Sequence, residues 1–81
     1  MTRRQFSGET VAAVLIDNGY YPVDRTGSHL QLRYEHPETG EVRTVTVPMH
    51  DEIATGTLRD IADKCGALVF DAFCAWIKRN S

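Results

Sequence analysis

The sequence lacks the features of membrane and secreted proteins. Its 81 residues include no apolar run that approaches the roughly 20 residues of a membrane helix. The positively charged start, residues 1–6, leads into Ser7-Gly8-Glu9 and not into the apolar segment of a secretory signal. We therefore expect a single domain, residues 1–81, that acts in the cytoplasm and not at a membrane.

Cysteine is scarce, and its placement argues against two further classes. Cys65 and Cys74 are too few for a disulfide framework and lack the paired spacing of a zinc site. Each falls on a helix face that otherwise carries apolar side chains, where a free cysteine behaves as a small hydrophobe. The three histidines have no recognisable metal-ligand spacing either. We expect reduced cysteines in the core, no bound metal and no other cofactor.

Positive charge is also limited. Nine Lys and Arg residues against eleven Asp and Glu give a net charge of −2, whereas proteins that bind nucleic-acid backbones are usually basic. This balance weighs against such a function without excluding it, because seven of the nine cations are arginines, whose planar fork suits phosphate. A local patch on this chain would bind phosphate weakly and with a strong salt dependence.

A first helix is predicted from Ser7 to about Asn18. Ser7 is a favourable N-cap, and Phe6 lies where it can pack against Val11 in the helix. Gly19 provides the left-handed residue that ends many helices. The apolar side of this helix is narrow, so the helix must pack on another element.

Three strands should follow, at residues 20–25, 29–36 and 42–47. Pro22 places the first strand at a sheet edge, since proline cannot donate a hydrogen bond to a neighbouring strand. The second strand alternates, with Leu30 and Leu32 on one face and His29 on the other. It forms a hairpin with the third strand, in which Arg43 falls on the apolar face and must extend its charged end toward solvent.

Two more helices complete the predicted fold. Thr57 is expected to cap the second helix and Gly66 to end it. A short third helix carries Phe70, Phe73, Cys74 and Ile77 at helical spacing. This order predicts an α+β two-layer sandwich with the helices on one face of the sheet. The other face is open and carries His29, Gln31, Arg33, Thr44 and Thr46.

Five segments of the chain resemble the HicA, or YcfA-like, mRNA interferase toxins. They are Ser7-Gly8-Glu9, Gly19-Tyr20, Arg25-Thr26-Gly27-Ser28-His29, Val45-Thr46-Val47-Pro48-Met49-His50 and Gly56-Thr57-Leu58-Arg59-Asp60-Ile61. The resemblance spans most of the chain and implies a double-stranded-RNA-binding-domain-like fold, α-β-β-β-α, here with an extra C-terminal helix. It also implies the toxin of a type II toxin–antitoxin system, which cuts mRNA when free and is inhibited by a HicB antitoxin.

In that family the histidine of the Gly-Ser-His element is catalytic, which implies this role for His29. Histidine suits the proton transfers of metal-free RNA cleavage because it titrates near neutral pH. Cleavage needs both a base and an acid, so His50 is the candidate for the second role, whereas His36 is expected to be a surface residue. The expected RNA contacts are Gly27, Ser28 and Arg33 and, at the start of the second helix, Thr57 and Arg59.

Other interpretations stay open. A solvated strand histidine is more common than a catalytic one, and the arginines can simply pair with Asp24, Glu35 and Asp63. The chain is then either a non-catalytic RNA-binding module, which its acidic balance favours, or a protein-interaction domain that uses its aromatic end or an open sheet edge. Residues 67–81 are more aromatic than the family leads us to expect, and they fit an oligomer contact or an antitoxin contact.

Overall fold

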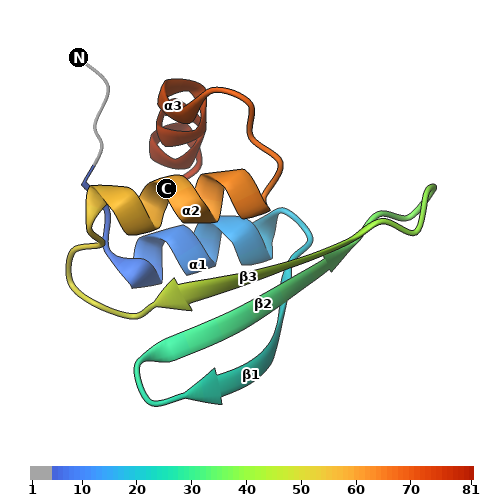
Figure 1. The fold of residues 1–81 in the computed structure, drawn as a ribbon, viewed down its shortest axis with the longest axis horizontal. Coiled ribbons are helices and arrows are strands. Elements are labelled where there is room, and N and C mark those ends of the chain that lie inside the picture. The colour runs from blue at the N-terminus through green and yellow to red at the C-terminus, as the bar shows by residue number, and fades with distance from the viewer. Residues whose placement is uncertain (1–4) are drawn as a thin grey trace.

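A computed structural model describes residues 5–81, in which helices and strands follow one another in the predicted order (Figure 1). The elements are α1 (Gly8–Asp17), β1 (Tyr21–Thr26), β2 (His29–Glu35), β3 (Val42–Pro48), α2 (Thr55–Lys64) and α3 (Phe70–Asn80). α1 and α2 lie on one side of the sheet, and α3 packs against these two helices. The predicted α+β sandwich with an extra C-terminal helix is confirmed.

The sheet is antiparallel, with the strand order β1-β2-β3. Its central register places Leu32 of β2 opposite Val45 of β3, and both side chains are buried under the helices. At the end of the same pair of strands, His29 lies opposite Pro48. Thr46 points the other way and is exposed, as the alternation of β3 predicts. The sheet therefore has one packed face and one open polar face.

β1 is the edge strand, and it extends away from the helices (Figure 1). All six of its residues are exposed, and its pairing with β2 shifts register between Pro22 and Asp24. The edge position predicted from Pro22 is confirmed. The strand begins one residue later than predicted because Tyr20 turns into the core, where its ring stacks on Tyr34 at a centroid distance of 5.1 Å.

The core lies between the sheet and the helices and continues up to α3. Its largest fully buried side chains include Leu15, Leu32, Leu58, Ile61 and Ile77. Both cysteines are free, with Cys74 buried in this core and Cys65 at its edge. Burial of this apolar surface is the main favourable contribution to folding for a chain of this size.

α1 begins and ends as its sequence predicts. The Ser7 Oγ accepts a hydrogen bond from the Thr10 N–H at 3.1 Å, which confirms Ser7 as the N-cap. Phe6 and Val11 are both buried. Gly19 follows the helix with φ +103°, a conformation that costs glycine little and other residues more.

α2 begins three residues earlier than a cap at Thr57 implies, so the expected Thr57 cap is wrong. The N-cap is Ala54, which makes no side-chain hydrogen bond to the helix, and Thr57 lies inside the first turn. The start of the helix is fixed by tertiary contacts, because the neighbouring Ile53 is buried and its N–H donates to the Phe6 carbonyl at 2.8 Å. This anchoring outweighs the local preference of a threonine for the cap position. Gly66 follows the helix with φ +78°, as expected.

Candidate functional site

His29 is presented to solvent by the tight turn between β1 and β2. Gly27 and Ser28 form a two-residue hairpin loop, with Gly27 at φ +59° in its first position. Loops of this kind favour glycine there because the positive φ matches the twist of the strands. His29 is the first residue of β2, and it is exposed. The sequence therefore predicted its placement correctly.

The structure brings His50 to the same place from the loop after β3. The pairing of β2 with β3 continues one step beyond His29, since the Met49 N–H donates to the Ser28 carbonyl. The next residue, His50, places its Nε2 3.3 Å from the Ser28 Oγ. The rings of His29 and His50 lie edge to face, with centroids 6.3 Å apart. We call Ser28, His29 and His50 the histidine site.

The N-terminus of α1 holds the backbone of His50. The Gly8 N–H donates to the His50 carbonyl at 2.9 Å. The two segments approach so closely that a Cβ on Gly8 would lie 2.0 Å from the Pro48 carbonyl oxygen. Residue 8 therefore has to be glycine for this contact to form. This role of Gly8 was not predicted from the sequence, although Gly8 belongs to one of the segments that carry the family resemblance.

Arg33 lies on the open side of β2, four residues beyond His29. At about 3.3 Å per residue this places it about 13 Å along the strand, which is too far to contact a phosphate held at His29. Its Nε lies 3.3 Å from a Glu35 carboxylate oxygen, and both side chains are about half exposed. Arg33 can bind a phosphate next to the one held at His29, but it is not part of the histidine site.

The backbone at the start of α2 and the side chain of Arg59 make contacts in different parts of the structure. The earlier start of the helix means that the Leu58 N–H is used within α2, by the Ala54 carbonyl at 2.9 Å. Thr57 remains in the first turn, where backbone N–H groups have no partner inside the helix. The guanidinium carbon of Arg59 lies 4.3 Å from the ring centroid of Phe70 in α3. Arg59 is thus held toward the third helix.

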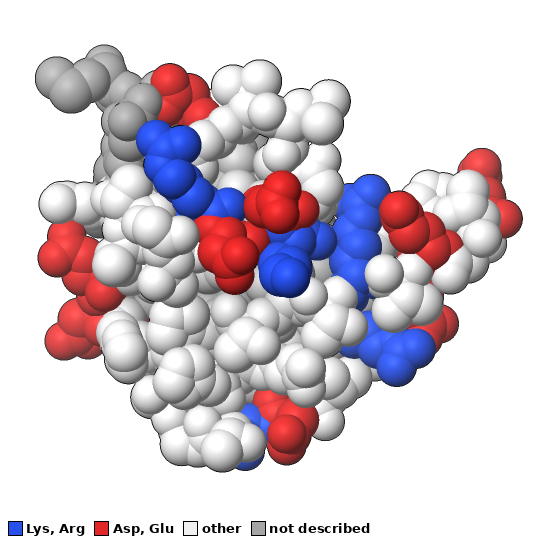
Figure 2. All heavy atoms as spheres, in the orientation of Figure 1, with Lys and Arg blue, Asp and Glu red and all other residues white. Residues whose placement is uncertain are grey.

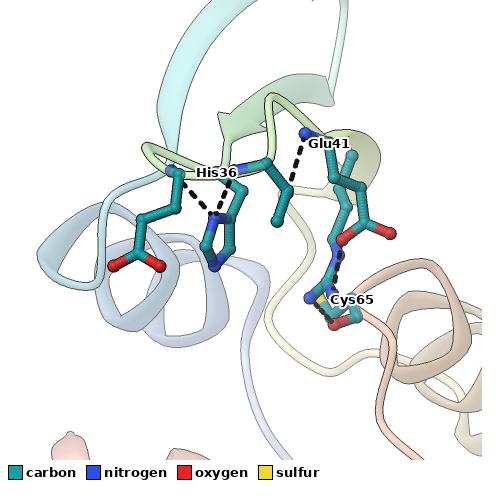
Figure 3. Close-up of polar contacts among 6 residues, drawn as sticks. His36, Glu41 and Cys65 are labelled. Carbon is teal, nitrogen blue, oxygen red and sulfur yellow. Dashed lines mark hydrogen bonds and ion pairs between the residues drawn. The ribbon is translucent and has the colours of Figure 1, made fainter.

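His36 lies at the far end of β2 and has a structural role. Its Nδ1 accepts hydrogen bonds from the Glu38 and Thr39 N–H groups, at 3.1 and 3.2 Å (Figure 3). These bonds close the turn between β2 and β3. Our expectation of a surface residue is therefore only partly right, because the ring is half-buried and organises the hairpin.

Arg43 lies at that end with its side chain one-third exposed. Its charged end leaves the core, as predicted, but it packs against the end of α2 and does not extend freely into solvent. Its guanidinium donates to the Cys65 carbonyl at 2.6 Å and to a Glu41 carboxylate oxygen at 2.9 Å (Figure 3). The first bond joins β3 to the C-terminal end of α2. It also explains how a charged residue is accommodated on the apolar face of the strand.

A groove of about 630 Å³ opens beside this arginine, between the ends of α1, β2 and α3. We call it the aromatic groove; its side chains include Tyr20, Tyr34, Phe73 and Trp76. Burial raises the pKa of the Tyr20 hydroxyl above its usual value of 10.0, and its hydrogen bond with Cys65 raises that pKa further. Burial also raises the pKa of the Cys65 thiol. Leu68, at the rim of the groove, is 99% exposed.

Charge is mixed on the surface. On the face shown in Figure 2, most lysine and arginine side chains lie next to aspartate or glutamate side chains, and a broad area carries no charge. Attraction of a polyanion to this face is therefore weak. Within residues 5–81, no group of three or more His, Cys, Asp or Glu side chains is arranged to hold a metal ion.

The fold and the comparisons with known proteins agree. A three-stranded antiparallel sheet in the order α-β-β-β-α is the architecture of double-stranded-RNA-binding-domain-like proteins. A family model described as the HicA toxin of bacterial toxin–antitoxin systems matches residues 8–67, from α1 to just beyond α2. The chain therefore belongs to the HicA toxin family, as its sequence predicted. No curated protein and no solved structure matched the chain.

Family membership defines the protein as a toxin of a toxin–antitoxin system and implies an antitoxin partner and an RNA target. The matched segment contains the whole histidine site. α3 lies beyond it, although this helix contributes fully buried residues to the core. Among the described residues, none of the helices has the length and apolar character required to cross a membrane.

Proposed function

We propose that this protein is a metal-independent endoribonuclease that cleaves mRNA in the cytoplasm, with His29 as its catalytic residue. The observation that carries the proposal is the exposed His29 ring lying 6.3 Å from the ring of His50. Two imidazoles at this distance can reach opposite sides of one phosphodiester. His29 starts β2, which is anchored in the core by the buried Leu32, so it stands on a rigid support.

The pair can perform both proton transfers of RNA cleavage. One imidazole takes the proton from the ribose 2′-hydroxyl, and the 2′-oxygen attacks the phosphorus. The bond from phosphorus to the 5′-oxygen breaks, and the second imidazole, as imidazolium, gives its proton to that leaving oxygen. We propose His29 for one of these roles and His50 for the other, since each step of this kind is worth about 100- to 10,000-fold in rate.

The remaining polar groups are proposed to hold the RNA. Gly27 and Ser28 directly precede His29 in the turn, and their backbone groups can contact the ribose-phosphate of the RNA. Arg33 lies farther along the open face, and Thr57 offers its backbone N–H at the start of α2. Arg59 is proposed to contact RNA at a greater distance from the histidine site, because it lies against Phe70 of α3.

The test is cleavage of a defined RNA by the purified protein with and without a chelator. We expect His29→Ala to remain folded and to lose at least 100-fold in rate, with wild-type cleavage unaffected by the chelator. His36→Asn is the matched control, because asparagine retains an acceptor for the turn, and it should cleave normally. In the same assay, Arg33→Ala should weaken RNA binding and its salt dependence more than Arg59→Ala. Equal cleavage by wild type and His29→Ala would contradict the proposal.

A second candidate is a non-catalytic RNA-binding module of the same fold. The net charge of −2 favours this candidate over an active nuclease, because an acidic chain holds its RNA only weakly for cleavage. RNA binding without cleavage by the wild type would identify this alternative.

We also propose a HicB-type protein as the antitoxin. The aromatic groove lies partly beyond the family-matched segment and is a candidate contact for this antitoxin or for a second copy of the chain. If Leu68→Asp abolishes antitoxin binding, the groove contacts the antitoxin. If it abolishes self-association, the groove contacts a second copy of the chain. If Leu68→Asp changes neither antitoxin binding nor self-association, the groove contacts neither partner.

A further inference from the structure

Ser28 is a neighbour of both histidines of the histidine site. It directly precedes His29, and its hydroxyl oxygen is 3.3 Å from the Nε2 of His50. We propose that Ser28 is a positioning residue that fixes the imidazole of His50 beside His29, so that the two rings act as an acid–base pair. This inference rests on the proposed ribonuclease function and deepens it, since it assigns the side chain of Ser28 to His50 and leaves only the Ser28 backbone to contact the RNA.

The backbone of His50 is already restrained on two sides. The Met49 N–H donates to the Ser28 carbonyl, and the His50 carbonyl accepts from the Gly8 N–H at 2.9 Å. These bonds fix where the Cα of His50 lies, but they leave its ring free to rotate. An exposed histidine samples several staggered rotamers. A further contact is therefore needed to hold the ring toward His29.

Ser28 supplies that contact. Within residues 5–81, its hydroxyl is the hydrogen-bond partner of the His50 ring. Ser28 can do this because its own position is fixed by the tight turn at Gly27 and by pairing with Met49. The hydroxyl is thus a rigid point on the β1–β2 turn to which the loop after β3 is attached.

A serine is chemically suited to a histidine that changes protonation state. The hydroxyl can accept from an Nε2–H and can also donate to an unprotonated Nε2. When Nε2–H donates to Ser28, the proton that His50 exchanges with substrate is the one on Nδ1. His50 can then lose that proton to the leaving 5′-oxygen and remain hydrogen-bonded to Ser28 as the neutral ring. The contact survives the catalytic step.

The same geometry makes Ser28 easy to test. Its backbone bond to Met49 does not involve the side chain, and Ser28 itself is exposed in the turn. Ser28→Ala should therefore fold normally, which circular dichroism checks. Ser28→Thr keeps the hydroxyl and serves as the conservative control.

The kinetic experiment compares Ser28→Ala, His50→Ala and the double variant in cleavage of one short RNA. If Ser28 positions His50, Ser28→Ala should lower kcat about tenfold, the worth of one hydrogen bond, and leave KM unchanged. Ser28→Thr should restore most of the rate. In the His50→Ala background, Ser28→Ala should have no further effect. A raised KM with additive losses in the double variant would overturn the proposal and assign Ser28 to RNA binding.

A second measurement needs neither RNA nor catalysis. Nitrogen NMR of the histidine rings reports which ring nitrogen carries the proton and whether it is hydrogen-bonded. Ser28→Ala should change the signals of His50 and leave those of His36 unchanged. Unchanged His50 signals would refute the Ser28 contact, even if His29→Ala abolishes cleavage. Changed His50 signals in a protein that does not cleave RNA would support the contact and count against the ribonuclease function alone.

Discussion

The two ends of β2 are built in different ways. At its start, the histidine site consists of exposed side chains on a turn and a loop, held in place largely by backbone hydrogen bonds. At its far end, the aromatic groove consists of buried and half-buried rings supported by α1 and α3. The histidine site is suited to a polar substrate that binds and dissociates, and the aromatic groove is suited to contact with an apolar surface.

The family-matched segment explains this difference in part. The whole histidine site lies within residues 8–67, whereas Phe73 and Trp76 of the groove lie beyond it. The first end thus carries what the chain shares with the family. The second end includes surface that the family model does not describe. Substitutions at the two ends should therefore differ in their effects on stability and on activity.

The largest expected effect is on stability and comes from α3. Ile77 is fully buried, so Ile77→Ala should lower the free energy of unfolding by about 2–5 kcal/mol. The rate of RNA cleavage per folded molecule should not change. Urea unfolding measures the loss of free energy of unfolding. Leu68→Ala is the control, because Leu68 is 99% exposed and its truncation should cost no more than about 0.5 kcal/mol. A loss below about 1 kcal/mol for Ile77→Ala would mean that α3 is not an integral part of the core.

A smaller effect on stability, coupled to activity, is expected at Gly8. A Cβ there would meet the Pro48 carbonyl oxygen at 2.0 Å, and relieving such a contact costs about 1–3 kcal/mol. Since the loop that moves carries His50, Gly8→Ala should also slow RNA cleavage. Gly56→Ala is the matched control, because a Cβ at Gly56 has open space. If Gly8→Ala cleaves RNA at the wild-type rate, the α1 contact does not position the site.

The smallest effect is confined to alkaline pH and to the aromatic groove. The pKa of the Tyr20 hydroxyl is raised above 10.0 in the folded protein, mainly by burial. The folded state therefore holds this proton more tightly than the unfolded chain does. The stabilisation is fully present below the unfolded pKa and is lost as the pH rises above it.

Urea unfolding at about pH 8 and about pH 10.5 tests this expectation. The protein with Tyr20 should lose more stability over this interval than Tyr20→Phe, which has no hydroxyl to ionise. Because Cys65 is hydrogen-bonded to Tyr20 and its pKa is also raised by burial, both proteins carry Cys65→Ala, which removes the thiol from the comparison. The same loss in both proteins would show that Tyr20 ionises as easily in the folded state as in the unfolded chain.

Much of the fold could be predicted from local patterns. The Ser7 cap, the alternation of β2 and the glycines after α1 and α2 follow from short-range sterics and hydrogen bonding. The start of α2 could not be predicted in this way, because burial of Ile53 decides it against the preference of Thr57. The prediction failed where a long-range contact competed with a local one.

The sequence by itself determined the order of the elements, the open face of the sheet and the exposure of His29 on its glycine turn. These features depend on residues close together in the chain, so their physical causes are visible in the sequence. Only the tertiary structure decided that His50 lies against Ser28, that Gly8 holds its backbone and that Arg59 lies over Phe70. These contacts join residues 11 to 42 positions apart, and they form only after the sheet and helices pack.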